Sequence, residues 1–232
     1  MLNAPSVHWV EFRFNAGRLA LDLSATVRRR ASAPHDLLAA PGGAARWLEE
    51  AGLVRHALRL APARAKALLR LREAIWLTAS ALIEHRPWPA HAARLINRAA
   101  AHPVAVPRLD ASSFDGSGLE KGRARCTFST PDTLKAALSS IARDAIELLT
   151  SADAHRIKAC AQPDCRMLFL DGSPAGRRRW CSMNRCGSRA KGRTFRLERA
   201  ARAQAGAAHR PARGASTSGA SGGRVRSGQE RK

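Results

Sequence analysis

The chain has 232 residues, of which 45% are hydrophobic, and it carries a formal net charge of +22 with a pI near 11.6. This charge predicts polyanionic partners and says little about the fold. No apolar stretch reaches about 18 residues, which excludes a membrane-spanning helix, and residues 1–14 lack the apolar segment of a secretion signal. We therefore expect a cytoplasmic protein with one substantial core and a small second module.

The amino-terminal region mixes strand and helix signals. Alternating apolar and charged residues predict a strand over residues 10–14, and an apolar segment at 19–23 begins either a strand or a helix. Proline and glycine predict a loop over residues 31–43. A short helix around Trp47 is expected to end near Gly52.

The central region has the clearest helical periodicity. Apolar residues recur at helical spacing from Pro62 to His85, with Arg72 and Glu73 expected on other faces. A further helix through residues 95–97 follows a proline-rich break. This pattern predicts two neighbouring helices that bury one face each.

Two strands and a helix are expected next. The strands are predicted at residues 104–106 and 125–128, joined by a Gly/Ser-rich stretch. The second strand contains Cys126, which we interpret as a buried thiol because no base is placed to activate it. A helix opened by residues 130–132 continues through Leu148.

Four cysteines form two equally spaced pairs, Cys160-x4-Cys165 and Cys181-x4-Cys186. In a reducing compartment such pairs favour a zinc site over disulfides or free thiols. Four thiolates leave no open position, so we expect one structural zinc ion that supplies most of the module's folding free energy. The nearby His155 and Asp164 are then surface residues.

Positive charge is concentrated around and after these cysteines. From residue 156 to the end, 19 Lys/Arg face four acidic residues, a formal net charge of +15. A solvated surface is the alternative to phosphate binding, but too few acids are present to balance this charge. The nucleic-acid-binding candidates are Arg177, Arg178, Arg179, Arg185, Arg189, Lys191, Arg193 and Arg196. A helix after the last cysteine would place Arg189, Arg193 and Arg196 on one face.

Several short motifs occur together in this chain. The carboxy-terminal part contains CAQPDC at residues 160–165, RRWCSM at 178–183 and CGSR at 186–189. The amino-terminal part contains GRLALDLSAT at residues 17–26 and LREA at 71–74. Together these motifs resemble those of bacterial two-part proteins with an amino-terminal ABATE domain and a carboxy-terminal CGNR-type zinc finger.

The chain departs from the family pattern at two positions. Ser188 and Ala25 stand where the family usually has asparagine. The first change keeps the cysteines and alters a local hydrogen bond, whereas the second removes a polar side chain from the region where the family is suspected to hold a ligand. Asp22 and Thr26 are the candidate ligand-binding residues there, and Asp22 is equally well explained by hydrogen bonds to backbone.

The simple composition of residues 201–232, without apolar periodicity, predicts a disordered basic tail. For the rest of the chain, the resemblance implies an α+β protein in which residues 1–152 form a mixed ABATE-like domain and residues 153–200 a treble-clef-like four-cysteine zinc finger. It further implies a DNA-binding, nucleoid-associated transcription regulator whose amino-terminal domain senses an unknown small molecule.

Two alternatives come from other functional classes. An RNA-binding or ribosome-associated zinc module would show the same charge and cysteines, but RNA readers stack bases on exposed aromatic residues, which are few here. An enzyme in the amino-terminal domain is the second alternative. No nucleophile–base pair, phosphate loop or paired carboxylates are found in the sequence, so we expect no catalysis.

Overall fold

The computed structural model describes residues 11–54, 58–110, 125–128 and 134–208. Contacts along the chain group it into a first unit up to Ala190 and a second unit from Lys191. None of the described helices is both long and apolar enough to cross a membrane. The two units are described separately below.

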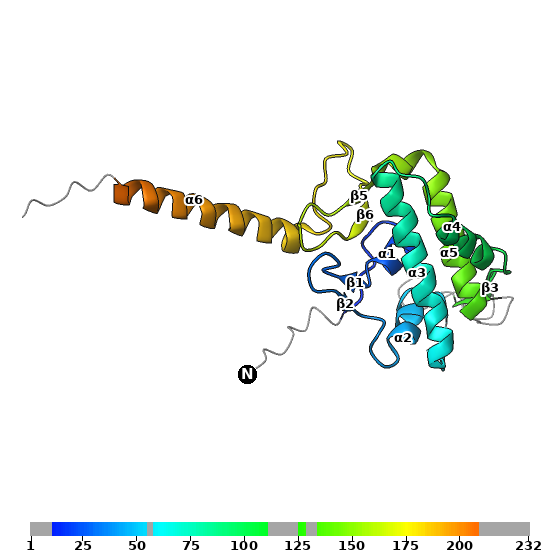
Figure 1. Ribbon diagram of the computed structural model, residues 1–232. Coiled ribbons are helices and arrows are strands. Elements are labelled where there is room, and N and C mark those ends of the chain that lie inside the picture. The colour runs from blue at the N-terminus through cyan, green and yellow to red at the C-terminus, as the bar shows by residue number, and fades with distance from the viewer. Residues whose placement is uncertain (1–10, 55–57, 111–124, 129–133, 209–232) are drawn as a thin grey trace, which may run out of the picture. The chain divides into compact units, whose positions relative to one another are not determined.

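Helices build most of the described part of the first unit (Figure 1). They are α1 (Leu19–Ser24), α2 (Gly43–Glu50), α3 (Pro62–Ile83), α4 (Ala90–Ala100) and α5 (Leu134–Thr150). The long helices α3, α4 and α5 pack against one another, and the short α1 contacts both α3 and α5. The predicted helices around residues 47, 62–85, 95–97 and 148 are therefore confirmed, and the segment at 19–23 is a helix.

Local sequence signals explain where these helices begin and end. Pro62 occupies the first turn of α3, where its missing N–H costs nothing. Gly52, just after α2, has φ of 69°, a conformation that glycine adopts without strain. Leu68, Leu71 and Ile75 recur on one face of α3 and are all buried. With Trp47 and Ile141 they belong to the larger apolar core, here called the first core.

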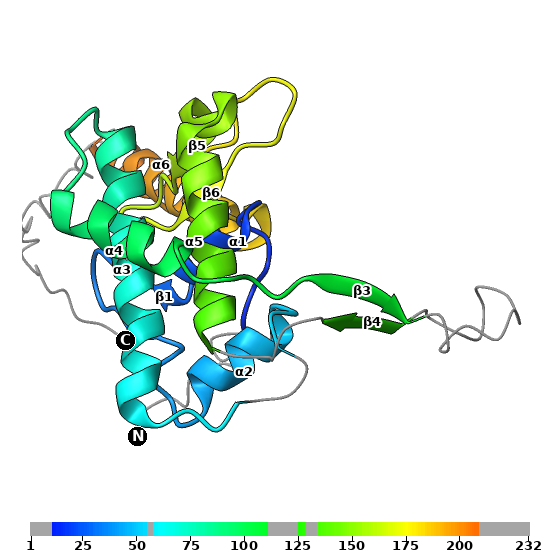
Figure 2. The same ribbon diagram turned by 90° about the vertical axis from the view of Figure 1, so that its right-hand side faces the viewer.

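Among the described residues, the first unit also contains three two-stranded antiparallel sheets. The pairs are β1 (Val27–Arg28) with β2 (His35–Asp36), β3 (Pro107–Asp110) with β4 (Arg125–Phe128), and β5 (Ile157–Ala159) with β6 (Leu168–Leu170). Figure 2 shows β3 and β4 extending beyond the helices. In this pair Pro107 lies opposite Phe128. The strand predicted at residues 125–128 is thus confirmed.

Two strand predictions were wrong. Residues 11–14 form no strand; Phe12 is buried and the Phe14 ring lies 5.9 Å from that of Trp47, so aromatic contacts hold an irregular segment in place. The strand expected at 104–106 begins instead at Pro107, a residue tolerated at the start of an edge strand. The helix opening at 130–132, the Gly/Ser-rich link and the Cys126 side chain lie outside the described residues.

A second apolar core joins residues from both ends of the first unit. It is formed by Ala16, Leu21, Ala25, Ala79, Leu148, Leu149, Ile157, Met167, Leu168, Phe169 and the four paired cysteines. The strands β5 and β6 contact α3, and β6 also contacts α1. The cysteine module is therefore packed against the helical domain rather than folded around itself alone.

The last described element is α6 (Ser188–Ala208), which begins in the first unit and continues in the second. A helix after the last cysteine was predicted and is confirmed. Residues 201–208, expected to be disordered, belong to this helix. Their alanine content favours helix even without an apolar face. Residues 209–232 lie outside the described part of the chain.

Candidate metal centre

The four paired cysteines come together in one buried cluster. Their Sγ atoms all lie within 4.8 Å of one another, with Cys165 and Cys181 3.7 Å apart and Cys181 and Cys186 3.5 Å apart. All four are less than a tenth exposed. Ligands of a tetrahedral zinc–thiolate centre lie about 3.8 Å from one another, so the cluster has the size that this ion requires.

Short turns present the thiols to one another. Cys160 follows β5 and donates its N–H to the Met167 carbonyl at 2.8 Å, and Cys165 donates to the Gln162 carbonyl at 3.0 Å. Cys186 lies in η4 (Met183–Gly187), a single π-helical turn directly before α6. A hairpin with one pair of thiols and a turn-to-helix junction with the other is the arrangement expected of a treble-clef-like finger.

The glycine of the second turn lies against two side chains. A Cβ atom on Gly187 would lie 2.6 Å from the Met183 Sδ and 3.3 Å from the Trp180 ring, so a larger residue would push the flexible Met183 side chain aside and crowd the Trp180 ring. The neighbouring Ser188 donates its hydroxyl to the Met183 carbonyl at 3.2 Å. The serine that replaces the usual family asparagine therefore still braces this turn.

A buried carboxylate organises the loop between the two cysteine pairs. Asp171 accepts hydrogen bonds from the Ser173 backbone and hydroxyl and from the Arg178 N–H, and it pairs with Lys158 at 2.7 Å. The hydrogen bond from Lys158, followed by those from Ser173, lowers the pKa of Asp171 far below its usual value. Asp171 therefore stays ionised and fixes the loop that leads to Cys181.

Two of the predicted nucleic-acid-binding arginines are engaged within the module. Arg178 lies over the Phe169 ring at 4.5 Å and donates to the Trp180 carbonyl at 3.0 Å. Arg189 pairs with Asp164 at 2.8 Å and donates to the Cys186 Sγ at 3.3 Å. These contacts give both guanidinium groups a structural role that the sequence did not reveal.

The other basic candidates are placed differently. Arg177 and Arg179 are exposed in the loop before Cys181, and Arg185 is half-buried in η4. Lys191, Arg193 and Arg196 are exposed on α6 in the second unit. The module therefore carries basic side chains on a loop, and the second unit carries them on a helix.

The two ligand-binding candidates hold backbone in place. Asp22 accepts a hydrogen bond from the Ala16 N–H at 2.8 Å. Thr26 donates its hydroxyl to the Leu23 carbonyl at 2.7 Å and accepts from Arg72 at 3.2 Å. Burial raises the pKa of Asp22 to about 6, although hydrogen bonds from the 15–16 backbone oppose the rise. Both side chains are satisfied without a ligand.

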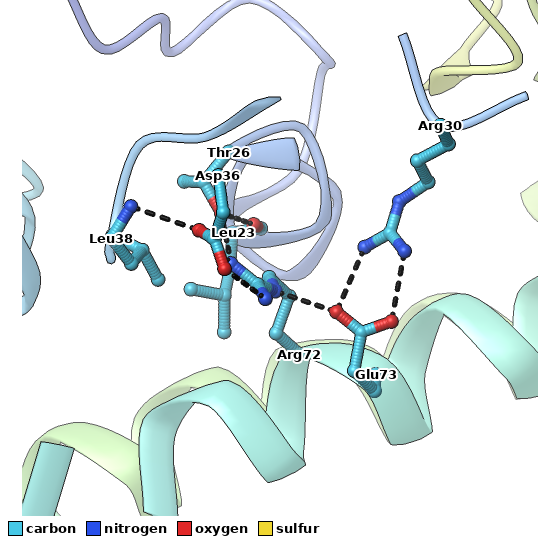
Figure 3. Close-up of polar contacts among 7 residues, drawn as sticks. All are labelled: Leu23, Thr26, Arg30, Asp36, Leu38, Arg72 and Glu73. Atoms are coloured by element: carbon cyan, nitrogen blue, oxygen red, sulfur yellow. Dashed lines mark hydrogen bonds and ion pairs between the residues drawn. The ribbon is translucent and has the colours of Figure 1, made fainter. Parts of the chain in front are cut away.

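The position of Arg72 differs most from the sequence-based expectation. Predicted on an outer face of its helix, Arg72 is only 4% exposed and forms two hydrogen bonds to Asp36, at 2.6 and 2.8 Å (Figure 3). It also pairs with Glu73 at 2.8 Å, and Glu73 in turn pairs with Arg30 through two hydrogen bonds. The only sequence signal for this network is the LREA motif, with a charged pair next to an apolar stripe.

Ala25 lies in the second core and is 1% exposed. Its side chain packs among apolar groups that include the cysteine cluster. Replacing it with the usual family asparagine would bury an amide there. In this chain position 25 lies where the helical domain packs against the cysteine module.

Fold and site together define a class of protein, a helical domain joined to a tetrathiolate zinc finger. The model of the ABATE family, described as a putative stress-induced transcription regulator, matches residues 17–152, and that of the CGNR zinc finger matches residues 156–199. The chain belongs to the ABATE family, as its motifs predicted. Its four paired cysteines form the site of one structural zinc ion. A search of curated proteins gave no match.

Proposed function

We propose that this protein is a transcription regulator that binds duplex DNA through the basic surface of α6 and the loop of the finger. The observation that carries the proposal is α6 itself, in which residues 191–199 contain Lys191, Arg193, Arg196 and Arg199, all exposed, against the single acid Glu198. An exposed basic helix is suited to phosphate contacts and to entry into the major groove.

The basic residues of the finger and those of α6 are expected to have different roles. Arg178 and Arg189 hold the finger together through Phe169, Asp164 and Cys186. Lys191, Arg193 and Arg196 are then the residues that meet phosphates. The distinction matters for the test, because a variant that removes Arg189 would disturb the metal site as well as the charge.

RNA is a second candidate partner, favoured by one specific observation. Phe195 on α6 is 64% exposed, whereas Phe169 is fully buried and Trp180 is half-buried. A single exposed aromatic side chain among arginines could stack on one unpaired base. Duplex DNA remains the first choice because exposed basic side chains can contact phosphates without a stacking platform.

The amino-terminal domain is proposed to be the regulatory half. A hollow of about 410 Å³ lies against α3 and α4, lined by Leu69, Leu77, Leu95 and His91. Arg72 and Glu73 also line it, so a small apolar molecule bound there would touch the buried ion network. A thermal-shift screen against apolar metabolites tests this role, and the proposal predicts stabilisers whose effect is lost in a Leu77→Lys variant.

Salt-dependent binding tests the main proposal. Each phosphate contact contributes about 0.9 to the slope of log K against log salt concentration. Replacing Lys191, Arg193 and Arg196 with alanine should reduce that slope by about 2–3 on duplex DNA. The matched control replaces three exposed arginines of the first unit, Arg64, Arg94 and Arg98, which removes the same charge from α3 and α4.

The control variant should bind nearly as the parent does. If the α6 variant keeps the parent's affinity and slope for both DNA and RNA, the helix has no part in nucleic-acid binding. If only RNA binding falls, and a Phe195→Ala variant reproduces the loss, the RNA alternative replaces the proposal.

A further inference from the structure

Arg28 is an arginine buried beside the metal centre. It belongs to β1, in the amino-terminal half of the chain, and is 6% exposed. One terminal nitrogen lies 3.4 Å from the Met167 Sδ, and the other donates to the Glu11 carbonyl at 3.4 Å. Among the described residues, no carboxylate forms a salt bridge with it.

A second buried arginine differs from Arg28 because it has carboxylate partners. Arg72, 4% exposed, is paired with the carboxylates of Asp36 and Glu73. A buried charge without a counter-charge is strongly unfavourable, and such groups are normally paired or hydrogen-bonded. Arg28 has a thioether and one carbonyl, neither of which carries a negative charge. Its counter-charge must come from another group nearby.

The cysteine cluster is the neighbouring source of negative charge. Met167 follows Cys165 by two residues and belongs to the same core as all four thiols. Burial lowers the pKa of Arg28 to about 10 and the nearby Arg13 adds to this, whereas negative charge on Cys181, Cys165 and Cys186 opposes it. Four thiolates around one divalent cation leave a net charge of about −2, and bound metal maintains this charge by keeping all four cysteines deprotonated.

We propose that Arg28 is the charge partner of the metal-loaded thiolate centre, so that loading this centre stabilises the β1–β2 hairpin of the amino-terminal domain. Arg189, which donates to the Cys186 Sγ at 3.3 Å, neutralises the same centre from the first turn of α6. One arginine is contributed by the ABATE domain and one by the helix proposed to bind DNA. The proposal itself rests on the zinc site and is independent of nucleic-acid binding.

The hairpin connects this partnership to the rest of the domain. Val27 pairs with Asp36 in the β1–β2 ladder, and Asp36 is the residue that holds Arg72 of α3. Because binding linkage is reciprocal, anything that favours the hairpin conformation seen here also raises metal affinity, and loss of metal loosens the hairpin. Zinc binding thus influences the conformation of the ABATE domain in addition to stabilising the finger.

The test compares metal affinity in three full-length variants. Arg28→Met removes the charge and keeps the apolar stem, Arg28→Lys keeps the charge, and Arg72→Met removes a buried arginine that has its own carboxylates. Zinc dissociation constants are measured by competition with a chromophoric chelator. Outer-shell partners of a metal site typically change affinity by about 10–100-fold, so Arg28→Met should weaken zinc binding by that factor. Arg28→Lys should recover most of it. Arg72→Met removes a contact of the hairpin but leaves the charge beside the metal, so it should weaken zinc binding much less than Arg28→Met does.

Thermal unfolding supplies a readout that a merely structural role would not reproduce. Arg28→Met should lower the Tm of the zinc-loaded protein while leaving that of the metal-stripped protein equal or higher, because the uncompensated charge is gone. Arg72→Met should lower both. The proposal is overturned if Arg28→Met lowers the Tm of the zinc-loaded and of the metal-stripped protein equally, or if this variant keeps the parent's zinc affinity.

A measurement on the unaltered protein covers the case in which Arg28→Met does not fold. Hydrogen exchange is compared with and without zinc. The Leu37 N–H, bonded to the Thr26 carbonyl at 3.0 Å beside the hairpin, should lose much more protection on metal removal than amides in α4. Equal protection of Leu37 in the two states also overturns the proposal.

Discussion

The two cores of the first unit differ in the side chains that form them. The first core contains Trp47 and large aliphatic residues of the five helices α1 to α5, and it includes none of the paired cysteines. The second core contains the four thiols, Phe169 and a few small or aliphatic residues. Large apolar side chains stabilise the first core by burial alone, whereas the second holds too little apolar surface and depends on metal.

The helix α1 and its C-terminal neighbour Ala25 contribute side chains to both cores and are here called the shared wall. Ala20 and Leu23 face the first core, whereas Leu21 and Ala25 belong to the second. Gly17, just before α1, has φ of 94°, and a Cβ atom there would lie 3.0 Å from the Leu170 Cβ of β6. The Ala16 carbonyl accepts the Leu170 N–H at 2.7 Å. The zinc finger is therefore completed by the amino-terminal domain, and damage to one core should be felt in the other.

Replacing Cys181 with serine should have the largest effect. With one thiolate lost, the module should release zinc, which supplies on the order of 10 kcal/mol in structural sites. Because α1 is shared, the amino-terminal helices should also unfold at lower temperature. Elemental analysis and circular dichroism measure the two effects, with Cys126→Ser as the control. Full zinc occupancy in Cys181→Ser would show that the cysteines do not form the site.

Replacing Arg72 with methionine removes the ion network between α3 and the β1–β2 hairpin. The change leaves Asp36 half-buried without its partner, which should cost about 3–5 kcal/mol in the free energy of unfolding. Urea denaturation measures the loss. The double variant Arg72→Met, Asp36→Leu should recover much of it, because no unpaired charge remains. A single variant as stable as the parent would show that the network in Figure 3 contributes nothing.

Replacing Ala25 with asparagine tests the shared wall. The amide would enter an apolar site that is 1% exposed, at a cost of about 1–3 kcal/mol for the polar group. The stability of both cores should fall together, as measured by urea denaturation of the zinc-loaded protein. The control is Ala25→Ser, a smaller polar side chain, which should cost less. Unchanged stability in Ala25→Asn would place this position in a polar site instead.

Replacing Asp22 with asparagine should have the smallest effect and the opposite sign. Because burial raises the pKa of Asp22 to about 6, the folded state binds its proton more tightly than the unfolded state, and ionisation costs stability as pH rises from about 4 to above 6. Asp22→Asn should therefore be more stable than the parent at pH 7.5, by on the order of 1–2 kcal/mol. The difference should shrink towards pH 4. A variant less stable at pH 7.5 would mean that the charge itself is needed.

Local sequence patterns were sufficient to predict the elements that depend on neighbouring residues. The periodicity of α3 and the spacing of Cys160, Cys165, Cys181 and Cys186 depend on neighbouring residues, so one sequence was sufficient. The helix at residues 201–208 was missed because its alanines favour helix without giving an apolar face.

Long-range pairing could not be predicted in the same way. An arginine on a helix is normally exposed, and Arg72 is buried only because Asp36 lies opposite it in a segment expected to be a loop. The same limit applies to Arg28 and to the shared wall. Leu21 and Leu23 are both apolar, and nothing in their spacing tells which core each one enters.

Simultaneous measurement of zinc release and helix melting tests most directly whether the two cores form one folded unit. A single sample of the zinc-loaded protein is heated with a chromophoric chelator, which reports zinc, while far-ultraviolet circular dichroism reports the helices of the first core. Coincident midpoints are expected, because α1 cannot leave one core without disrupting the other. Zinc release well below the melting of α3, α4 and α5, with the helices then unfolding at an unchanged temperature, would contradict the account.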